Sequence, residues 1–314
     1  SSNVTRSIVL YSGQHPQLTQ SLVSAFEKKT GINVKVRYND GVILADQLLQ
    51  EGQASPADVF LTENSPELML LEDKKMLARL PMKILNQIPP DYSSPSGDWV
   101  GVALRISCLA YNPSMISASQ LPSSILNLSS DAWKNRVAIA PTDSDFVPLV
   151  GAVVAKYGKR EALSWLAGLK RNGSIYQDDE SVVSAVNRGA VAVGIVNQYY
   201  WYRLRLQEGS AAMHSTLYYF GSNDAGSIEN ISGVGIIESS TKKNLSEQFV
   251  SFLVSKQGQQ ILSKSDDFEY PARSGVAPNS ALVPISRINP ASVSVIQLGD
   301  DRQAAALIQQ SGLT

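Results

Sequence analysis

The sequence has little sulfur and little imidazole. Its 314 residues include one cysteine, Cys108, and two histidines, His15 and His214. A single cysteine cannot form an internal disulfide, and it excludes zinc or iron–sulfur sites that need several thiolates. Two histidines likewise exclude a metal site built from several imidazoles. A metal site in this chain would therefore depend mainly on oxygen ligands.

Net charge and long apolar runs are also lacking. The formal net charge is -1, so we expect no general attraction to nucleic acid or to an anionic membrane. No stretch approaches the roughly 20 apolar residues of a transmembrane helix. The chain begins Ser1-Ser2-Asn3-Val4-Thr5, without Met and without a signal peptide. We expect a mature exported protein whose signal peptide has been removed.

Strands and helices alternate in the first third of the chain. Buried-type strands are predicted over residues 7–12, 32–38 and 57–61, from their β-branched and apolar runs. A helix follows each strand, and the first two end at Gly31 and Gly52. This β-α-β-α-β-α order predicts a doubly wound, mostly parallel sheet with flanking helices.

Later segments predict a second lobe of the same kind. Residues 100–104 and 107–111 are expected to be two strands that cross to it, and residues 232–237 a strand that returns. A chain of 314 residues is long enough for two such lobes. We expect an α/β fold with a ligand cleft between an N-terminal lobe, residues 1–103 plus 228–275, and a C-terminal lobe, residues 104–227 plus 276–314.

Polar side chains follow three of the predicted strands. His15 comes after the first, Glu63 after the third, and Tyr199 and Tyr200 after a strand over residues 190–196. Ligands of such sheets bind outside the carboxyl ends of the strands, so these groups are expected to form one composite site. Asn197 is a good N-cap for the helix that the tyrosines begin, and the positive end of its dipole favours phenolate.

The chemistry of these four side chains indicates a hard, trivalent metal ion. Two phenolates and one carboxylate supply three negative charges, while a neutral imidazole supplies none. Oxygen ligands suit hard cations, and calcium or magnesium would not deprotonate a phenol at neutral pH. Ferric iron is the abundant biological candidate.

The sequence resembles the bacterial periplasmic ferric-ion-binding proteins of iron ABC transporters, also called bacterial transferrins. The resemblance covers most of the chain, and its most specific part is the tyrosine motif. The motifs that carry it are Leu10-Tyr11-Ser12-Gly13-Gln14-His15, Asp40-Gly41-Val42-Ile43-Leu44-Ala45-Asp46-Gln47, Pro56-Ala57-Asp58-Val59-Phe60-Leu61-Thr62-Glu63-Asn64-Ser65-Pro66 and Asn197-Gln198-Tyr199-Tyr200-Trp201-Tyr202-Arg203-Leu204.

The resemblance implies a non-enzymatic cargo protein with a type II periplasmic binding protein (venus flytrap) fold. It would bind Fe(III) through His15, Glu63, Tyr199 and Tyr200, and would deliver the ion to a membrane ABC permease and its ATPase. It also implies a monomer in the periplasm or, as a lipoprotein, at the cell surface. Glu63 could instead form a salt bridge across the closed cleft.

One departure from the family concerns the anion that many members hold beside the iron. Small uncharged donors usually hold it, but this chain has Asp143-Ser144-Asp145 at the corresponding turn and Asp179 upstream of the tyrosines, although Asn197 is kept. Unpaired carboxylates would repel an anion, so a synergistic anion such as phosphate is not expected. Water could fill the open positions, Arg105 or backbone N–H groups could hold an anion, or Asp143 or Asp145 could approach the metal.

Three other functions remain open from the residues alone. The first is a binding protein of the same fold for thiamine, a polyamine or a phosphonate, with the tyrosines stacked on the ligand. The second is a metalloenzyme with phenolate-bound iron. The third is a docking protein that binds no small ligand.

Overall fold

The computed structural model describes residues 6–314, and the chain divides into two compact units. The first unit comprises Ser1–Leu104 and Ile231–Leu282, and the second comprises Arg105–Asn230 and Val283–Thr314. Residues 1–5, on which the expectation of a removed signal peptide depends, lie outside the described part. Among residues 6–314, no helix combines the length and the apolar character that crossing a membrane requires.

The first unit contains a sheet in the strand order β2-β1-β3-β9. Strands β1 (Ser7–Ser12), β2 (Asn33–Tyr38) and β3 (Val59–Thr62) are parallel, as the alternating pattern predicts, and β9 (Glu229–Ile236) is antiparallel to β3. Since β1 and β3 are parallel neighbours, their carboxyl ends lie at the same edge of the sheet. The loops that carry His15 and Glu63 begin at that edge.

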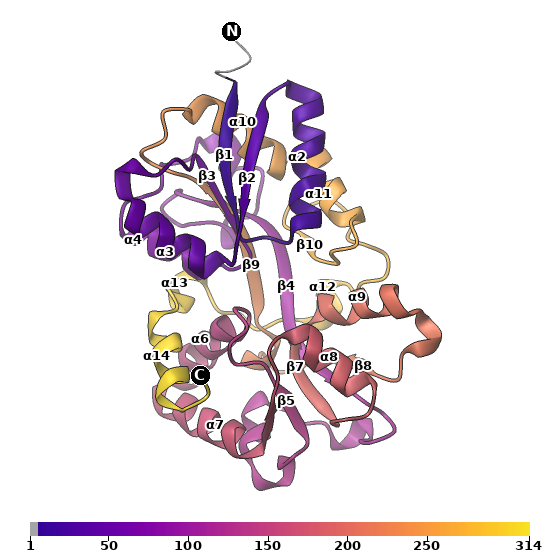
Figure 1. Ribbon diagram of the computed structural model, residues 1–314. Helices are drawn as coiled ribbons and strands as arrows, with labels where there is room; N and C mark the ends of the chain where they lie inside the picture. Colours follow the sequence, from indigo (N-terminus) through magenta and orange to yellow (C-terminus); the bar gives the residue numbers. More distant parts are fainter. Residues whose placement is uncertain (1–5) are drawn as a thin grey trace. The chain divides into compact units, whose positions relative to one another are not determined.

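Helices cover both faces of this sheet. In Figure 1, α2 (Pro16–Thr30) and α11 (Lys256–Lys264) lie on one side of the strands, and α3 (Gly41–Glu51) and α4 (Ser65–Asp73) lie on the other. The core on the α2 side includes Phe26, whose ring centroid is 5.1 Å from that of Phe249 in α10. Full burial of one such side chain contributes roughly 1.5–3 kcal/mol. The remaining elements of this unit are a 3-10 turn (Gly52–Ala54), α5 (Met82–Leu85), a 3-10 turn (Pro90–Tyr92), α10 (Lys243–Val254) and β10 (Tyr270–Pro271).

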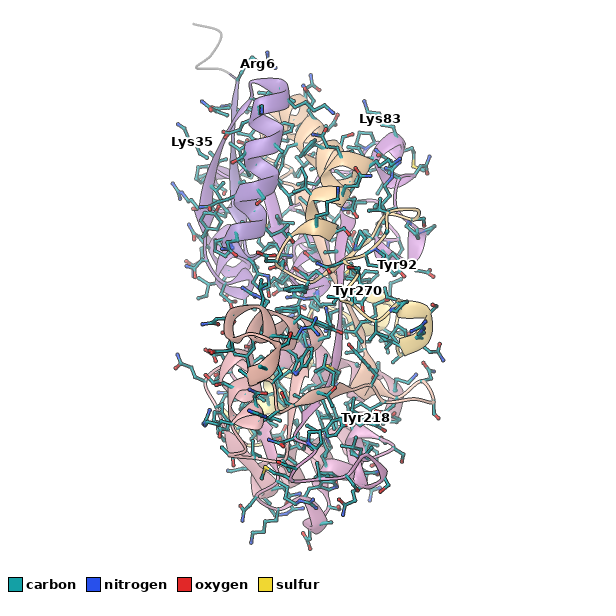
Figure 2. The ribbon with its side chains drawn as sticks, turned by 90° about the vertical axis from the view of Figure 1, so that its right-hand side faces the viewer. Arg6, Lys35, Lys83, Tyr92, Tyr218 and Tyr270 are labelled. Carbon is teal, nitrogen blue, oxygen red and sulfur yellow. The ribbon has the colours of Figure 1, made fainter. Side chains whose placement is uncertain are left out.

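Two glycines allow close packing of the loops at the sheet edge. A Cβ atom at Gly13 would lie 2.7 Å from the Gly41 Cα, and one at Gly41 would lie 2.3 Å from Thr62 Oγ1. A side chain fits at neither position, so the loop before His15 can lie directly against the start of α3 and the end of β3. Figure 2 shows that Lys35 and Lys83, by contrast, lie at the outside of this unit, and both are exposed.

In the second unit the strand order continues as β4-β7-β5-β6. Strand β4 (Val100–Tyr111) begins in the first unit, and its Ser107–Tyr111 part is antiparallel to β7 (Val193–Asn197). Strand β5 (Val137–Ile139) is parallel to β7 and to β6 (Gly173–Ile175). The other elements are α6 (Phe146–Tyr157), α7 (Lys159–Asn172), α8 (Asp179–Asn187), α9 (Gln198–Glu208), β8 (Thr216–Tyr218), α12 (Ile285–Ile288), α13 (Val295–Leu298), α14 (Arg302–Gln310), and 3-10 turns at Ala118–Gln120, Ile125–Ser129, Asp131–Trp133, Ser210–Ala212 and Ala225–Ser227.

One predicted boundary is wrong. Residues 100–104 and 107–111 were expected to be separate strands, but they form the single strand β4, because Arg105 and Ile106 between them are fully buried and extended. The charged Arg105 lies inside this strand. In the structure its guanidinium has a phenol partner inside the second unit, which makes its burial possible.

Candidate metal-binding residues

His15 lies in the N-cap position of α2, in the loop that follows β1. Glu63 comes directly after β3, so the parallel strands bring the two side chains to one edge, as the sequence predicts. His15 Nε2 is 3.0 Å from Glu63 Oε1, and the side chains are 13% and 14% exposed. Both are therefore partly accessible to an ion.

The other side of the imidazole contacts two carboxylates that sequence reasoning missed. His15 Nδ1 is 2.7 Å from Asp267 Oδ1 and 3.5 Å from Glu269 Oε2. Burial alone would lower the pKa of His15, but the charges of Glu63 and Asp267 outweigh it and raise that pKa well above its usual value. In the metal-free protein the imidazole therefore favours the protonated form.

No sequence signal pointed to Asp267 or Glu269. They lie in a short segment after α11, where neither a helix nor a strand pattern is visible. They approach His15 because β10, which follows at Tyr270, pairs with the part of β4 at Ala103 and Leu104. This pairing joins segments more than 160 residues apart, and only the folded structure shows it. We call His15, Glu63, Asp267 and Glu269 the histidine cluster.

Tyr199 and Tyr200 lie in the first turn of α9, directly after β7, as predicted. Their ring centroids are 4.1 Å apart. The Tyr199 hydroxyl donates a hydrogen bond of 2.7 Å to Asp145 Oδ2, and the Tyr200 hydroxyl donates one of 3.1 Å to the same oxygen. Two phenols thus meet at one buried carboxylate.

Arg105 completes this second group of residues. Its Nη2 donates to the Tyr199 hydroxyl oxygen at 2.6 Å, and its guanidinium carbon is 4.7 Å from the centre of the Tyr199 ring. The same guanidinium lies 3.8 Å from Asp145, and both side chains are almost completely buried. The Tyr199 oxygen thus has a cationic donor on one side and accepts from it, while its own hydroxyl donates to Asp145. We call Arg105, Asp145, Tyr199 and Tyr200 the tyrosine cluster.

The positive end of the α9 dipole was expected to favour the phenolate form of Tyr200, but its effect is too small. Burial, and after it the negative charge of Asp145, raises the pKa of Tyr200 well above its usual value. These effects outweigh the position in the first turn, because desolvation and a nearby charge act more strongly than a helix end. In the metal-free protein Tyr200 therefore keeps its proton.

The remaining predicted residues surround the tyrosine cluster. Asp143 accepts hydrogen bonds from the backbone N–H groups of Asp145 and Asp179, both at 3.0 Å. Burial and the charges of Asp143 and Asp145 raise the pKa of Asp179 well above its usual value, which favours its neutral form. Ser144 is half-buried beside them. Repulsion of an anion by Asp179 is therefore weaker than the sequence suggested.

Asn197 does not cap α9 in the way that was expected. It occupies the N-cap position, but its side chain makes no capping hydrogen bond. Its Oδ1 instead accepts a bond of 3.5 Å from Asn230.

In both clusters the imidazole or the phenols carry protons that a metal cation could replace. Carboxylate, phenolate and imidazole are ligands for hard or borderline metal ions. Among the described residues, two groups could hold a metal ion: His15 with Asp267 and Glu269, and Asp143 with Asp145 and Asp179. In the tyrosine cluster, loss of both phenol protons would leave three negative oxygens at one point. Only a highly charged cation would compensate them, since Arg105 supplies a single charge.

Comparison with known proteins identifies the family. Residues 21–285 match the model of a family described as bacterial extracellular solute-binding protein. The chain belongs to this family. Two relatives are similar over nearly the whole chain. The "Fe(3+)-binding periplasmic protein" of Serratia marcescens is 38% identical over 98% of this chain and 90% of its own length. The "Major ferric iron-binding protein" of Neisseria meningitidis serogroup B is 33% identical over 98% and 93%.

A solved structure agrees with these relatives. Iron-bound HitA from Pseudomonas aeruginosa matches with a TM-score of 0.93 and 38% identity, over 98% of this chain and 99% of that chain. The predicted fold class, an α/β periplasmic binding protein with two lobes, is confirmed by this match, and so is the predicted resemblance to periplasmic ferric-ion-binding proteins.

Proposed function

We propose that this protein captures ferric iron outside the cytoplasm and delivers it to an ABC permease and its ATPase, without catalysing a reaction. The observation that carries the proposal is the tyrosine cluster, in which two phenols share one buried carboxylate beside a buried guanidinium. The names of the relatives from Serratia marcescens and Neisseria meningitidis support iron as the cargo. The family description supports the extracytoplasmic location and the transport partner.

The proposed ligands are Tyr199 and Tyr200 together with His15 and Glu63. Their two phenolates and one carboxylate neutralise a trivalent ion, and the imidazole adds a neutral donor. Four protein ligands leave two positions of a six-coordinate ion for water or a small anion. Asp145, at 2.7 Å and 3.1 Å from the two phenol oxygens, lies close enough to approach the same ion.

Binding and release are coupled to protons in this proposal. A ferric ion displaces the phenol protons of Tyr199 and Tyr200 and the Nε2 proton of His15, since metal ligands must be deprotonated. The pKa values of Tyr200 and His15 are both raised in the metal-free protein, so acid favours the proton over the metal. We therefore expect iron to leave as the pH falls.

An absorption spectrum and a metal analysis of the same sample test the proposal. Protein loaded with ferric citrate and then desalted should retain iron and show a visible phenolate-to-iron charge-transfer band. A colourless, iron-free sample would contradict it. Calorimetry with thiamine, a polyamine and a phosphonate is the control for an organic or oxyanion ligand, and gel filtration tests the expected monomer.

A further inference from the structure

His15 is held by protein groups on the side of its ring that faces away from Glu63. Nε2 is 3.0 Å from Glu63 Oε1, whereas Nδ1 is 2.7 Å from Asp267 Oδ1. The two nitrogens of one imidazole therefore have different partners. Asp267 is much less accessible than Glu63, with side-chain exposures of 4% and 14%. An ion from solvent reaches the Glu63 side more easily.

A second carboxylate and an amide also hold His15. Glu269, which is 0% exposed, lies 3.5 Å from the same His15 Nδ1. Gln14 donates from Nε2 to Glu269 Oε1 at 3.5 Å and to Ser232 Oγ at 2.9 Å, and its Oε1 accepts the His15 backbone N–H at 2.8 Å. Ser232 in turn donates to the Thr62 carbonyl at 2.7 Å. The backbone and the ring of His15 are thus fixed by one connected network.

The backbone between the two carboxylates has an unusual conformation. Phe268 has a φ of 58°, in the left-handed region that bulky residues seldom adopt. Its ring is buried, and Tyr270 beyond it pairs with β4, so the fold holds this turn in place. The consequence is that Asp267 and Glu269 both reach the imidazole of His15.

We propose that Asp267 is the positioning residue of His15, while Glu269 lies at the same ring nitrogen and Gln14 holds the His15 backbone. Asp267 accepts the Nδ1–H, fixes the orientation of the ring, and so presents Nε2 to the metal. Histidines that bind metals commonly donate their other N–H to a carboxylate, which also makes the ligating nitrogen a better donor. This inference rests on the proposed function, because it assumes that His15 binds the cargo ion.

The affinity test uses the isosteric change Asp267→Asn and the matched control Asp266→Asn, whose side chain is exposed next to it. Asp267→Asn should raise the dissociation constant for ferric iron about 10–100-fold, and Asp266→Asn should leave it unchanged. In a His15→Gln background, Asp267→Asn should cause no further loss, because Asp267 acts through His15. An equal loss in both backgrounds would overturn the positioning role.

A spectroscopic test uses the wild-type protein, so it does not depend on the folding of a variant. The chain has two histidines, and His214 is exposed, so the imidazole resonances of the intact protein provide their own reference. In the metal-free protein the Nδ1–H of His15 should exchange slowly with water. With diamagnetic gallium(III) bound, the nitrogen shifts should place the metal on Nε2 and the retained proton on Nδ1. A metal on Nδ1, or a rapidly exchanging Nδ1–H, would refute the proposal.

Different results would contradict the proposed function and the positioning role of Asp267. If the wild-type protein binds no ferric iron, the proposed function is wrong. If it binds iron and Asp267→Asn binds it equally well, only the positioning role is wrong. A lowered melting temperature of metal-free Asp267→Asn without any change in the dissociation constant would show a purely structural carboxylate, and would also overturn the inference.

Discussion

The histidine cluster and the tyrosine cluster are both nearly buried, but they balance charge in opposite ways. The histidine cluster has one imidazole among three carboxylates, so its positive charge is a proton that can leave. The tyrosine cluster has a permanent guanidinium charge on Arg105 and one carboxylate, and its removable protons lie on phenols. The difference shows which group responds to pH in each cluster.

A cation therefore meets two different electrostatic environments. Around His15 three carboxylates surround one imidazole. When the imidazolium loses its proton, their negative charge is no longer compensated. Around Tyr199 and Tyr200 negative charge appears only when the phenols ionise, which burial and Asp145 oppose at Tyr200. A metal that binds the tyrosines must be acidic enough to displace their protons, so we expect this cluster to favour highly charged ions and the histidine cluster to discriminate less.

The largest expected effect is on the visible absorption band, which should depend on the tyrosine cluster. Tyr199→Phe or Tyr200→Phe should abolish or strongly weaken both the visible band and iron retention after desalting, because a phenolate is the source of the band. Tyr218→Phe is the matched control, since it removes a hydroxyl in the same unit that donates to the Pro122 carbonyl. Absorption spectra with metal analysis measure the outcome, and a full band in both single variants would refute the role of the pair.

His15→Gln should have a smaller effect of a different kind. The phenolates remain, so the band should persist, while the dissociation constant rises by at least the roughly 10–100-fold that changes around a metal ligand cause. Glu63→Gln should behave in the same way if its carboxylate binds the ion directly. Competition with citrate measures both constants. Loss of the band in either variant would mean that the tyrosines cannot hold iron without the histidine cluster.

Arg105→Gln should have an intermediate effect on affinity and a clear effect on the spectrum. It removes the donor at 2.6 Å from the Tyr199 oxygen, so the phenolate becomes a better electron donor and the band should move to longer wavelength. Affinity should fall about 10-fold, near the lower end for such neighbours. Arg136→Gln is the control, because its guanidinium also packs on a ring, 5.1 Å from Trp133. An unshifted band would show that Arg105 has only a structural role.

The sequence predicted the parts of both clusters that follow strands. The alternation of strands and helices placed His15 and Glu63 at one sheet edge, and the first turn of α9 contains Tyr199 and Tyr200 as expected. These predictions depend on local residue patterns, which are visible in the sequence, and on the known geometry of parallel strands. The ligand roles of the four residues stay predictions until metal is measured.

The partners of these residues could not be predicted in the same way. Asp267 and Glu269 approach His15 through the pairing of β10 with β4, which has no local pattern. Arg105 was named only as a possible anion ligand, and only the fold shows its buried partner Tyr199. Asp145 was one of several acidic candidates, and only the fold shows that both tyrosines donate to it. Buried charges depend on long-range partners that sequence does not reveal.

The smallest expected effect is on the stability of the metal-free protein. The pKa of His15 is raised on folding, so the stabilisation from its proton is fully present below the unfolded value of about 6.5 and is lost as the pH rises through the folded value. His15→Gln should therefore lower the melting temperature most at about pH 6, and the difference from wild type should shrink at higher pH. His214→Gln, at an exposed histidine, is the control. A difference that grows with pH would mean that the three carboxylates do not stabilise the imidazolium.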